Sequence, residues 1–181
     1  MTLSSTDSRA KKTIQIGFSL GTNLGDRVDN MSRARQAILA AGDAREVGKS
    51  ALWETEPVDV KDEYRHLKFL NAVLIMDTAL TAREWLGLIA KMEADFGRKR
   101  EGDDKNAPRE IDIDIIFAGD QLIGSGGLVV PHPRWAERRF VVQPLAELQP
   151  DRVLPGSKHT VAEILASLPG ADELVRLEQD W

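Results

Sequence analysis

A run of alternating acidic and apolar residues, "EIDIDIIF" at positions 110–117, constrains the fold of this chain more than any other stretch. Residues two apart on a strand share one face. The face that packs into the interior is therefore predicted to hold the apolar set, Ile111, Ile113, Ile115 and Phe117. The opposite face holds Glu110, Asp112 and Asp114, with neighbouring Cβ atoms about 7 Å apart. Like charges at this spacing disfavour each other's ionised form, so the strand needs solvent or a cation opposite its acids.

Two interpretations of Asp112 and Asp114 are open on this pattern. An edge strand with a solvated acidic face explains the alternation, since antiparallel sheets commonly expose one polar face. A magnesium site explains it as well, because Mg²⁺ binds through one or two carboxylates together with substrate phosphates. Two ions about 3.5–4 Å apart could be bridged by such a pair. Glu110 lies at the start of the strand and is left outside the predicted site.

The segment before the acidic strand, residues 97–109, is strongly basic and lacks a large apolar side chain. Its cations are Arg98, Lys99, Arg100, Lys105 and Arg109. One interpretation is a solvated surface loop. The other is a lid, made mobile by Gly97 and Gly102, whose cations neutralise a polyphosphate as charge shifts during reaction.

The rest of the chain predicts alternating strands and helices from its apolar periodicity. Strands are expected at 13–20, 45–55 and 69–78, with the acidic strand fourth, and helices at 26–41 and 82–96. This β-α-β-β-α-β order is the split arrangement of ferredoxin-like α+β folds.

Residues beyond the acidic strand predict an elaboration packed on the same sheet. A short strand and turn are expected within 128–140, followed by helical pieces near 142–148 and 160–167. The expected fold is thus α+β, with a ferredoxin-like βαββαβ core and a C-terminal elaboration, in a three-layer sandwich of the α/β/α kind. Residues 1–12 are polar and are expected to be a flexible extension, with 13–181 a single domain.

Composition narrows the class of protein. The 181 residues suffice for one domain with a sizeable core, and the absence of cysteine excludes disulfides, thiolate zinc sites and thiol nucleophiles. A net charge of −5 argues against a general nucleic-acid binder, because counterion release needs a broad basic face. No apolar run approaches the roughly 18 residues of a membrane span, and the polar start lacks the apolar core of a secretion signal. We expect a cytoplasmic monomer whose partners are small molecules, with no nucleic acid and no membrane.

Two other places carry candidate binding residues. His132 lies between two prolines and is followed closely by Arg138, which makes it a candidate phosphate contact, although a lone histidine is more often structural. Phe69 and Asn71 share a strand face, where a flat heteroaromatic ring could stack on the phenyl group and bond to the amide. The pattern leaves a core phenylalanine beside a polar strand end equally open.

Several stretches, taken in order, resemble the 6-hydroxymethyl-7,8-dihydropterin pyrophosphokinases of folate synthesis. They are "SLGTNLGDR", "LWETEPV", "FLNAVL", "APREIDIDIIF" and "VPHPRWAERRFVVQPLAEL", and they span about residues 14–150. The Pro-Arg-x-Ile-Asp-x-Asp and Val-Pro-His-Pro motifs are individually specific, and their joint order is more so. The resemblance implies transfer of the β,γ-diphosphate of ATP to the pterin's hydroxymethyl group, with release of AMP, in tetrahydrofolate biosynthesis.

The resemblance also implies roles for particular residues. Asp112 and Asp114 would bind two Mg²⁺ ions that accompany ATP, and with Arg98 and Arg109 they form the expected catalytic set. The pterin site would consist of Thr55, Phe69, Asn71 and Phe140, with the ring held between two aromatic side chains. The ATP-binding residues would be Arg98, Arg100, Arg109, Ile115, Val129, His132 and Arg138, with Ile115 and the backbone around Val129 bordering the adenine.

Two departures from the family pattern concern closure of the site. Many members have Trp-Gly-Pro-Arg before the acidic strand, where this chain has Asn106-Ala107-Pro108-Arg109. Gly127 stands where some members have an arginine. These changes bear on closure, rate and ATP affinity and leave the expected reaction standing.

Two other functions use the same residues. A two-metal nucleotidyltransferase or cyclase also places paired aspartates on a ferredoxin-like sheet, and it would release pyrophosphate instead of AMP. A non-catalytic ferredoxin-like ligand-binding module would keep its function when Asp112 and Asp114 are both replaced by alanine.

Overall fold

The computed structural model describes residues 13–41, 44–57, 60–97, 108–170 and 174–181. The expected N-terminal extension, Arg98 and Arg100 lie outside these ranges. The helices are α1 (Arg27–Ala40), α2 (Ala82–Asp95), α3 (Arg139–Leu148) and α4 (Val161–Ser167). The strands are β1 (Ile14–Thr22), β2 (Arg45–Lys49), β3 (Leu52–Thr55), β4 (Phe69–Thr78), β5 (Asp112–Ala118), β6 (Ile123–Ser125), β7 (Leu128–Val130) and β8 (Leu174–Leu177).

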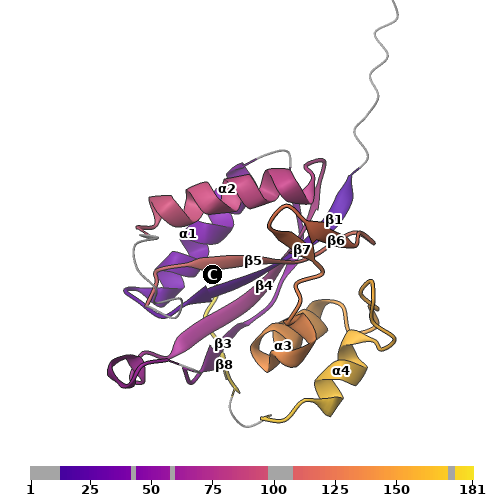
Figure 1. Cartoon of the computed structure of the whole chain (residues 1–181). Coiled ribbons are helices and arrows are strands. Elements are labelled where there is room, and N and C mark those ends of the chain that lie inside the picture. Colours follow the sequence, from indigo (N-terminus) through magenta and orange to yellow (C-terminus); the bar gives the residue numbers. More distant parts are fainter. Residues whose placement is uncertain (1–12, 42–43, 58–59, 98–107, 171–173) are drawn as a thin grey trace, which may run out of the picture.

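The described strands form an antiparallel six-stranded sheet in the order β5-β1-β4-β3-β8, with β2 also pairing with β4. β6 and β7 form a separate two-stranded sheet. Helices α1 and α2 cover one face of the large sheet, and α3 and α4 lie against the other (Figure 1). The structure is therefore a mixed α/β protein in three layers. None of the helices formed by the described residues has both the length and the apolar composition that a membrane crossing needs.

Most predicted elements are present, but the second strand is divided into β2 and β3. At the break, Ser50 donates its N–H to the carbonyl of Val73 (2.9 Å), and its hydroxyl accepts the N–H of Val73 (2.9 Å). A side chain here replaces a backbone acceptor, which interrupts the ladder. Strand β6, of three residues, and strand β8, of four, were not predicted.

Helix α2 forms where its own sequence predicts it. Thr81 and Glu84 make a capping box, in which the Glu84 N–H donates to Thr81 Oγ1 (3.3 Å) and the Thr81 N–H donates to Glu84 Oε2 (2.7 Å). The box satisfies backbone donors that a helix start leaves open. Trp85, Ile89 and Met92 follow at spacings of four and three residues and are all buried, so the apolar stripe faces the sheet.

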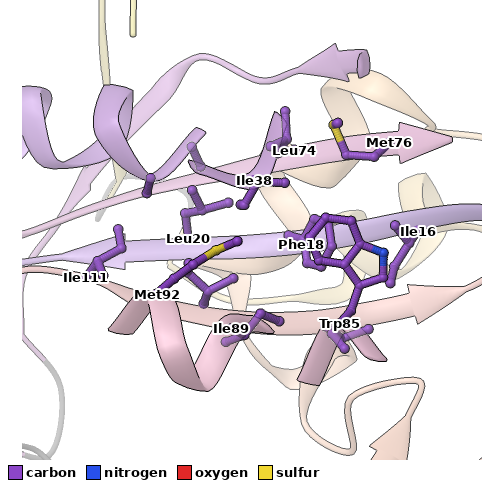
Figure 2. Packing of buried hydrophobic residues seen from close by; sticks show 14 of the residues in the cluster. Ile16, Phe18, Leu20, Ile38, Leu74, Met76, Trp85, Ile89, Met92 and Ile111 are labelled. Atoms are coloured by element: carbon purple, nitrogen blue, oxygen red, sulfur yellow. The ribbon is translucent and has the colours of Figure 1, made fainter. Parts of the chain in front are cut away.

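The core beneath α1 and α2 is built from alternate residues of the central strands. Phe18 of β1 lies edge-on to Trp85 of α2, with ring centroids 5.0 Å apart and an interplanar angle of 63° (Figure 2). The indole N–H of Trp85 donates to Thr78 Oγ1 (3.2 Å), so the buried ring keeps a polar partner. The surrounding buried residues include Ile16, Leu20, Leu74, Met76 and Ile89.

The other face of β5 departs from simple alternation. Gly17 of β1 pairs with Phe117, but Phe18 pairs with Ile115, so Ile116 is an extra residue at a bulge. The prediction that Phe117 shares a face with Ile115 is therefore wrong. Phe117 packs in the second core, beneath α3 and α4, because the bulge reverses the alternation after Ile115. The two aspartates precede the bulge and keep the predicted face.

Replacing each of two glycines with alanine should change the stability of the protein in opposite directions. A Cβ at Gly17 would overlap the ring of Phe117, lying 2.8 Å from Cδ1, so Gly17→Ala should lower the free energy of unfolding by about 1–3 kcal/mol. Gly87 lies inside α2, where a Cβ meets no described atom within 4 Å, so Gly87→Ala should raise it by about 0.5–1 kcal/mol. Urea unfolding measures both changes. A stabilised Gly17→Ala variant would contradict the packing of β1 against β5.

Candidate active site

A cavity of about 430 Å³ lies on the face of the sheet that α3 covers. Its volume is typical of small-molecule sites. Strands β1, β3, β4, β5 and β8 supply one side, and segments around α3 and after α4 supply the other. The cavity brings together most of the predicted site residues, namely Thr55, Phe69, Asn71, Arg109, Asp112, Asp114, Arg138 and Phe140.

Asp112 and Asp114 line this cavity from β5, beside the smallest side chains of β1. In the antiparallel ladder Asp112 pairs with Gly21 and Asp114 pairs with Ser19, so little side-chain volume competes for the space next to the acids. The two aspartate side chains are 31% and 43% exposed. Their carboxylates are therefore accessible to a ligand inside the cavity.

Guanidinium groups lie opposite these acids. Arg109 Nη1 is 3.0 Å from Asp112 Oδ1, and Arg138 Nη1 is 3.7 Å from Asp114 Oδ2. Arg109 comes from the segment just before β5, whereas Arg138 is the residue before α3. Two segments that are distant in sequence thus supply counter-charge to one acidic strand.

His132 approaches the same carboxylate, with Nε2 3.9 Å from Asp114 Oδ2. Burial lowers the pKa of the His132 imidazole, and the attraction of Asp114 offsets this only in part, so the neutral ring is favoured at neutral pH. His132 Nδ1 accepts the N–H of Arg134 (3.1 Å), which leaves the proton of the neutral ring on Nε2. Partial burial in the cavity wall also raises the pKa of Asp114, reinforced by Asp112 and opposed by the neighbouring cations.

Two buried side chains outside the cavity lining hold the backbone around the acidic strand. The side-chain Oδ1 of Asn23 accepts the backbone N–H of Arg109 (2.9 Å), and the backbone N–H of Asn23 donates to the Arg109 carbonyl (3.2 Å). Glu93 of α2 accepts the N–H of Ile113 on Oε1 (3.1 Å). Because β5 is an edge strand of the described sheet, a side-chain acceptor here takes the place of a neighbouring strand. Ile113 lies between the two aspartates, so this bond fixes the backbone that carries them.

The other end of the cavity is aromatic and contains an amide. Asn71 of β4 is 4% exposed and donates from Nδ2 to Thr55 Oγ1 (3.0 Å). Phe69 lines the cavity with Asn71, which confirms that they share a strand face. Phe140 lines it from the first turn of α3, and the Arg138 guanidinium lies 5.7 Å from the centre of its ring. Such an arrangement can stack a flat ring and bond to its edge.

Some predicted ATP-binding residues lie outside the cavity lining formed by the described residues. Ile115 is buried in the core beneath α1 and α2, and Val129 is exposed on β7. His132 reaches the site through its contact with Asp114 rather than as a lining residue. Arg98 and Arg100 lie outside the described residues. The ATP-binding roles of these residues stay predictions.

Several cavity residues were missed by sequence reasoning. Ser19 and Gly21 carried a signal, because they alternate along β1 with apolar core residues. No sequence signal indicated Leu168, Pro169 or Leu174, because only folding brings these residues to the cavity. The other missed residues are Glu56, Arg134, Glu137 and Arg139.

The donor set fits Mg²⁺ that is bound together with a phosphate ligand. The described part of the chain holds no group of three or more His, Cys, Asp or Glu side chains placed for a metal ion, so it offers no all-protein cage. Mg²⁺ needs none, since it usually keeps several waters and binds through one or two carboxylates plus substrate phosphates. Asp112 and Asp114 are a pair of this kind, on an accessible wall of the cavity.

Carboxylates and arginines at one end of a cavity and an aromatic slot at the other are groups that enzymes of phosphate transfer use. A sequence model of the family described as 7,8-dihydro-6-hydroxymethylpterin-pyrophosphokinase (HPPK) matches residues 17–150. The chain belongs to this family.

Relatives of two kinds are similar to the chain. The 2-amino-4-hydroxy-6-hydroxymethyldihydropteridine pyrophosphokinase of Pseudomonas aeruginosa is 35% identical over 155 residues, which cover 86% of this chain and 92% of that protein. The corresponding Bacillus subtilis protein is 39% identical over 132 residues, covering 72% and 75%. The folate synthesis bifunctional protein of Arabidopsis thaliana is 38% identical over 134 residues, covering 74% of this chain but only 27% of that protein.

Solved structures agree with the fold. The crystal structure of Plasmodium falciparum HPPK-DHPS A437G with pteroate aligns with a TM-score of 0.65 at 16% identity. The alignment covers 88% of this chain and 44% of that one, so the chain spans less than half the length of the HPPK-DHPS chain. At this identity the likeness concerns the fold alone.

Replacing Glu93 tests how the acidic strand is held. Glu93→Ala removes the acceptor of the Ile113 N–H, which should lower the free energy of unfolding by about 1–3 kcal/mol and speed exchange of that amide by about tenfold or more. Glu93→Gln keeps an oxygen acceptor and should retain most of the protection. NMR-detected hydrogen exchange at Ile113 measures the difference, and equal protection in the two variants would contradict this role.

Proposed function

We propose that this chain transfers diphosphate from ATP to 6-hydroxymethyl-7,8-dihydropterin, producing AMP and the pterin diphosphate for tetrahydrofolate biosynthesis. The observation that carries the proposal is a single cavity that contains both a carboxylate–arginine end and an aromatic, amide-containing end. Membership of the HPPK family supports it, as do bacterial relatives named as pyrophosphokinases that the chain covers over most of their length.

The carboxylate–arginine end is proposed to bind the triphosphate of ATP. Asp112 and Asp114 would hold two Mg²⁺ ions, which when bound neutralise phosphate charge and orient the reacting groups. Arg109 and Arg138, which now contact the aspartates, would turn to phosphate oxygens and stabilise charge that moves during transfer. Arg98 and Arg100 are proposed to assist from the basic segment.

The nucleoside side of ATP is proposed to extend from this end past His132. The neutral ring of His132 holds a proton on Nε2 and can donate a hydrogen bond from this nitrogen to a phosphate oxygen without adding a buried positive charge. Ile115 would contribute through its backbone, since its side chain is in the core, and the backbone around Val129 would border the adenine.

The aromatic end is proposed to bind the pterin. Phe69 and Phe140 would stack on the two faces of the ring, while the Asn71 amide and Thr55 bond to its polar edge. The pterin hydroxyl then attacks the β-phosphorus of ATP, the bond from that phosphorus to the α-phosphate oxygen breaks, and the hydroxyl proton is released. Positioning and electrostatics carry such a transfer, because few covalent steps fall to the protein.

We also infer a ferredoxin-like core, a single domain over residues 13–181, and a cytoplasmic monomer. The order β5-β1-β4-β3, with α1 and α2 on one face, supports the ferredoxin-like arrangement. The net charge of −5 supports the absence of nucleic-acid partners.

Replacing each acid separately tests the proposal. Asp112→Asn and Asp114→Asn should each lower the rate of pterin-dependent AMP formation by about 100-fold or more, because each removes an ionised ligand from the phosphate end. Glu110→Gln is the matched control, since Glu110 is a nearby acid outside the cavity lining, and it should keep nearly full activity. AMP formed from ATP, Mg²⁺ and 6-hydroxymethyl-7,8-dihydropterin is measured, with circular dichroism to confirm folding.

Two results would contradict this function. Release of pyrophosphate in place of AMP would support a nucleotidyltransferase or cyclase. Unchanged turnover in the Asp112→Ala, Asp114→Ala double variant would show that the acids take no part in catalysis.

A further inference from the structure

Three apolar residues that line the cavity come from a part of the chain beyond the family match. Leu168 and Pro169 follow α4, and Leu174 begins β8, whereas the match to the HPPK family ends at residue 150. The C-terminal segment therefore supplies a wall of the cavity for which the family match assigns no role. We name Leu168, Pro169 and Leu174 the C-terminal wall.

The C-terminal wall lies at the aromatic end of the cavity. Leu174 is the direct antiparallel partner of Thr55, so the two side chains stand on one face of the sheet with Cβ atoms about 4.5–5.5 Å apart. Thr55 in turn accepts the amide N–H of Asn71 (3.0 Å). Leu174 is thus next to the amide–hydroxyl pair and remote along the sheet from β5, which carries the aspartates.

Arg139 ties the wall to the start of α3. Its Nη1 donates to the carbonyls of Leu165 (3.2 Å), Leu168 (2.5 Å) and Pro169 (3.4 Å). These carbonyls lie at and beyond the end of α4, where helices leave acceptors open. Since Phe140 is the next residue, one arginine holds the wall and the aromatic side chain of the slot at a set separation.

We propose that the C-terminal wall determines which pterins the cavity accepts, and that Arg139 is a positioning residue for it. This inference rests on the proposed function. An apolar wall beside a polar amide–hydroxyl pair excludes water from the edge of a flat heteroaromatic ring. It also limits the substituents that the ring can carry, because added bulk would meet Leu174.

The strand β8 offers a matched pair of variants. Leu174→Trp fills the space next to Thr55 and should weaken binding of 6-hydroxymethyl-7,8-dihydropterin by about tenfold. Val175→Trp adds the same bulk on the opposite face of the strand, where Val175 is 55% exposed, and should change binding by less than about twofold. Calorimetry with Mg²⁺ and a non-hydrolysable ATP analogue present measures both. Equal affinities in the two variants would overturn the proposal.

A second pair tests Arg139. Arg139→Ala should raise the KM for the pterin about fivefold or more, with the KM for ATP within about twofold, because only the aromatic end loses its support. Arg139→Lys keeps one donor nitrogen and the positive charge, and should restore part of the loss. The control is Arg83→Ala, which removes an exposed arginine bonded to the carbonyls of Ser125 (2.9 Å) and Gly126 (3.4 Å). Equal rises in both KM values would indicate a general structural effect and overturn the role.

Assays of the unmodified protein distinguish failure of the proposed function from failure of the proposed role of the C-terminal wall. If the unmodified protein forms pterin-dependent AMP but Leu174→Trp binds the pterin normally, the proposed role of the C-terminal wall is wrong and the proposed function stands. If it neither binds the pterin nor forms AMP, both are wrong.

Discussion

Two like charges on the edge strand of a sheet are the constraint on which the rest of this site depends. Asp112 and Asp114 need counter-charge, and Arg109 and Arg138 supply it at 3.0 and 3.7 Å. Neither arginine belongs to the sheet. Their ion pairs with the aspartates therefore hold the segment before β5 and the start of α3 over one end of the sheet. The cavity lies between these elements, and the same guanidinium groups can exchange a carboxylate for a phosphate.

Small residues on β1 make room for this chemistry. The apolar side chains of β1 point toward α1 and α2, whereas Gly17, Ser19 and Gly21 line up on the cavity face. Gly17 receives the ring of Phe117, which the bulge in β5 turns to that side. On this face of the sheet, apolar packing therefore ends before the two aspartates. Their neighbours on β1, Ser19 and Gly21, contribute almost no apolar surface.

How far the sequence predicts the structure depends on how local each signal is. Helix α2 was predictable, since Thr81 and its capping box, the apolar stripe and the helix length all agree. The shared face of Phe69 and Asn71 was predictable from strand parity. The bulge at Ile116 was not, because a bulge is a property of the register between two strands. The break at Ser50 likewise depends on Val73, a residue on another strand.

Local periodicity, helix caps and motif order were enough to predict most of the elements and the family, and to single out the paired carboxylates as the predicted reactive centre. Three-dimensional packing alone decided that Glu93 and Asn23 hold the acidic strand and its arginine, and that the C-terminal wall lines the aromatic end. The physical reason is that hydrogen bonds and side-chain contacts join groups according to their distance in space. A pattern within one segment carries no information about which distant segment will lie against it.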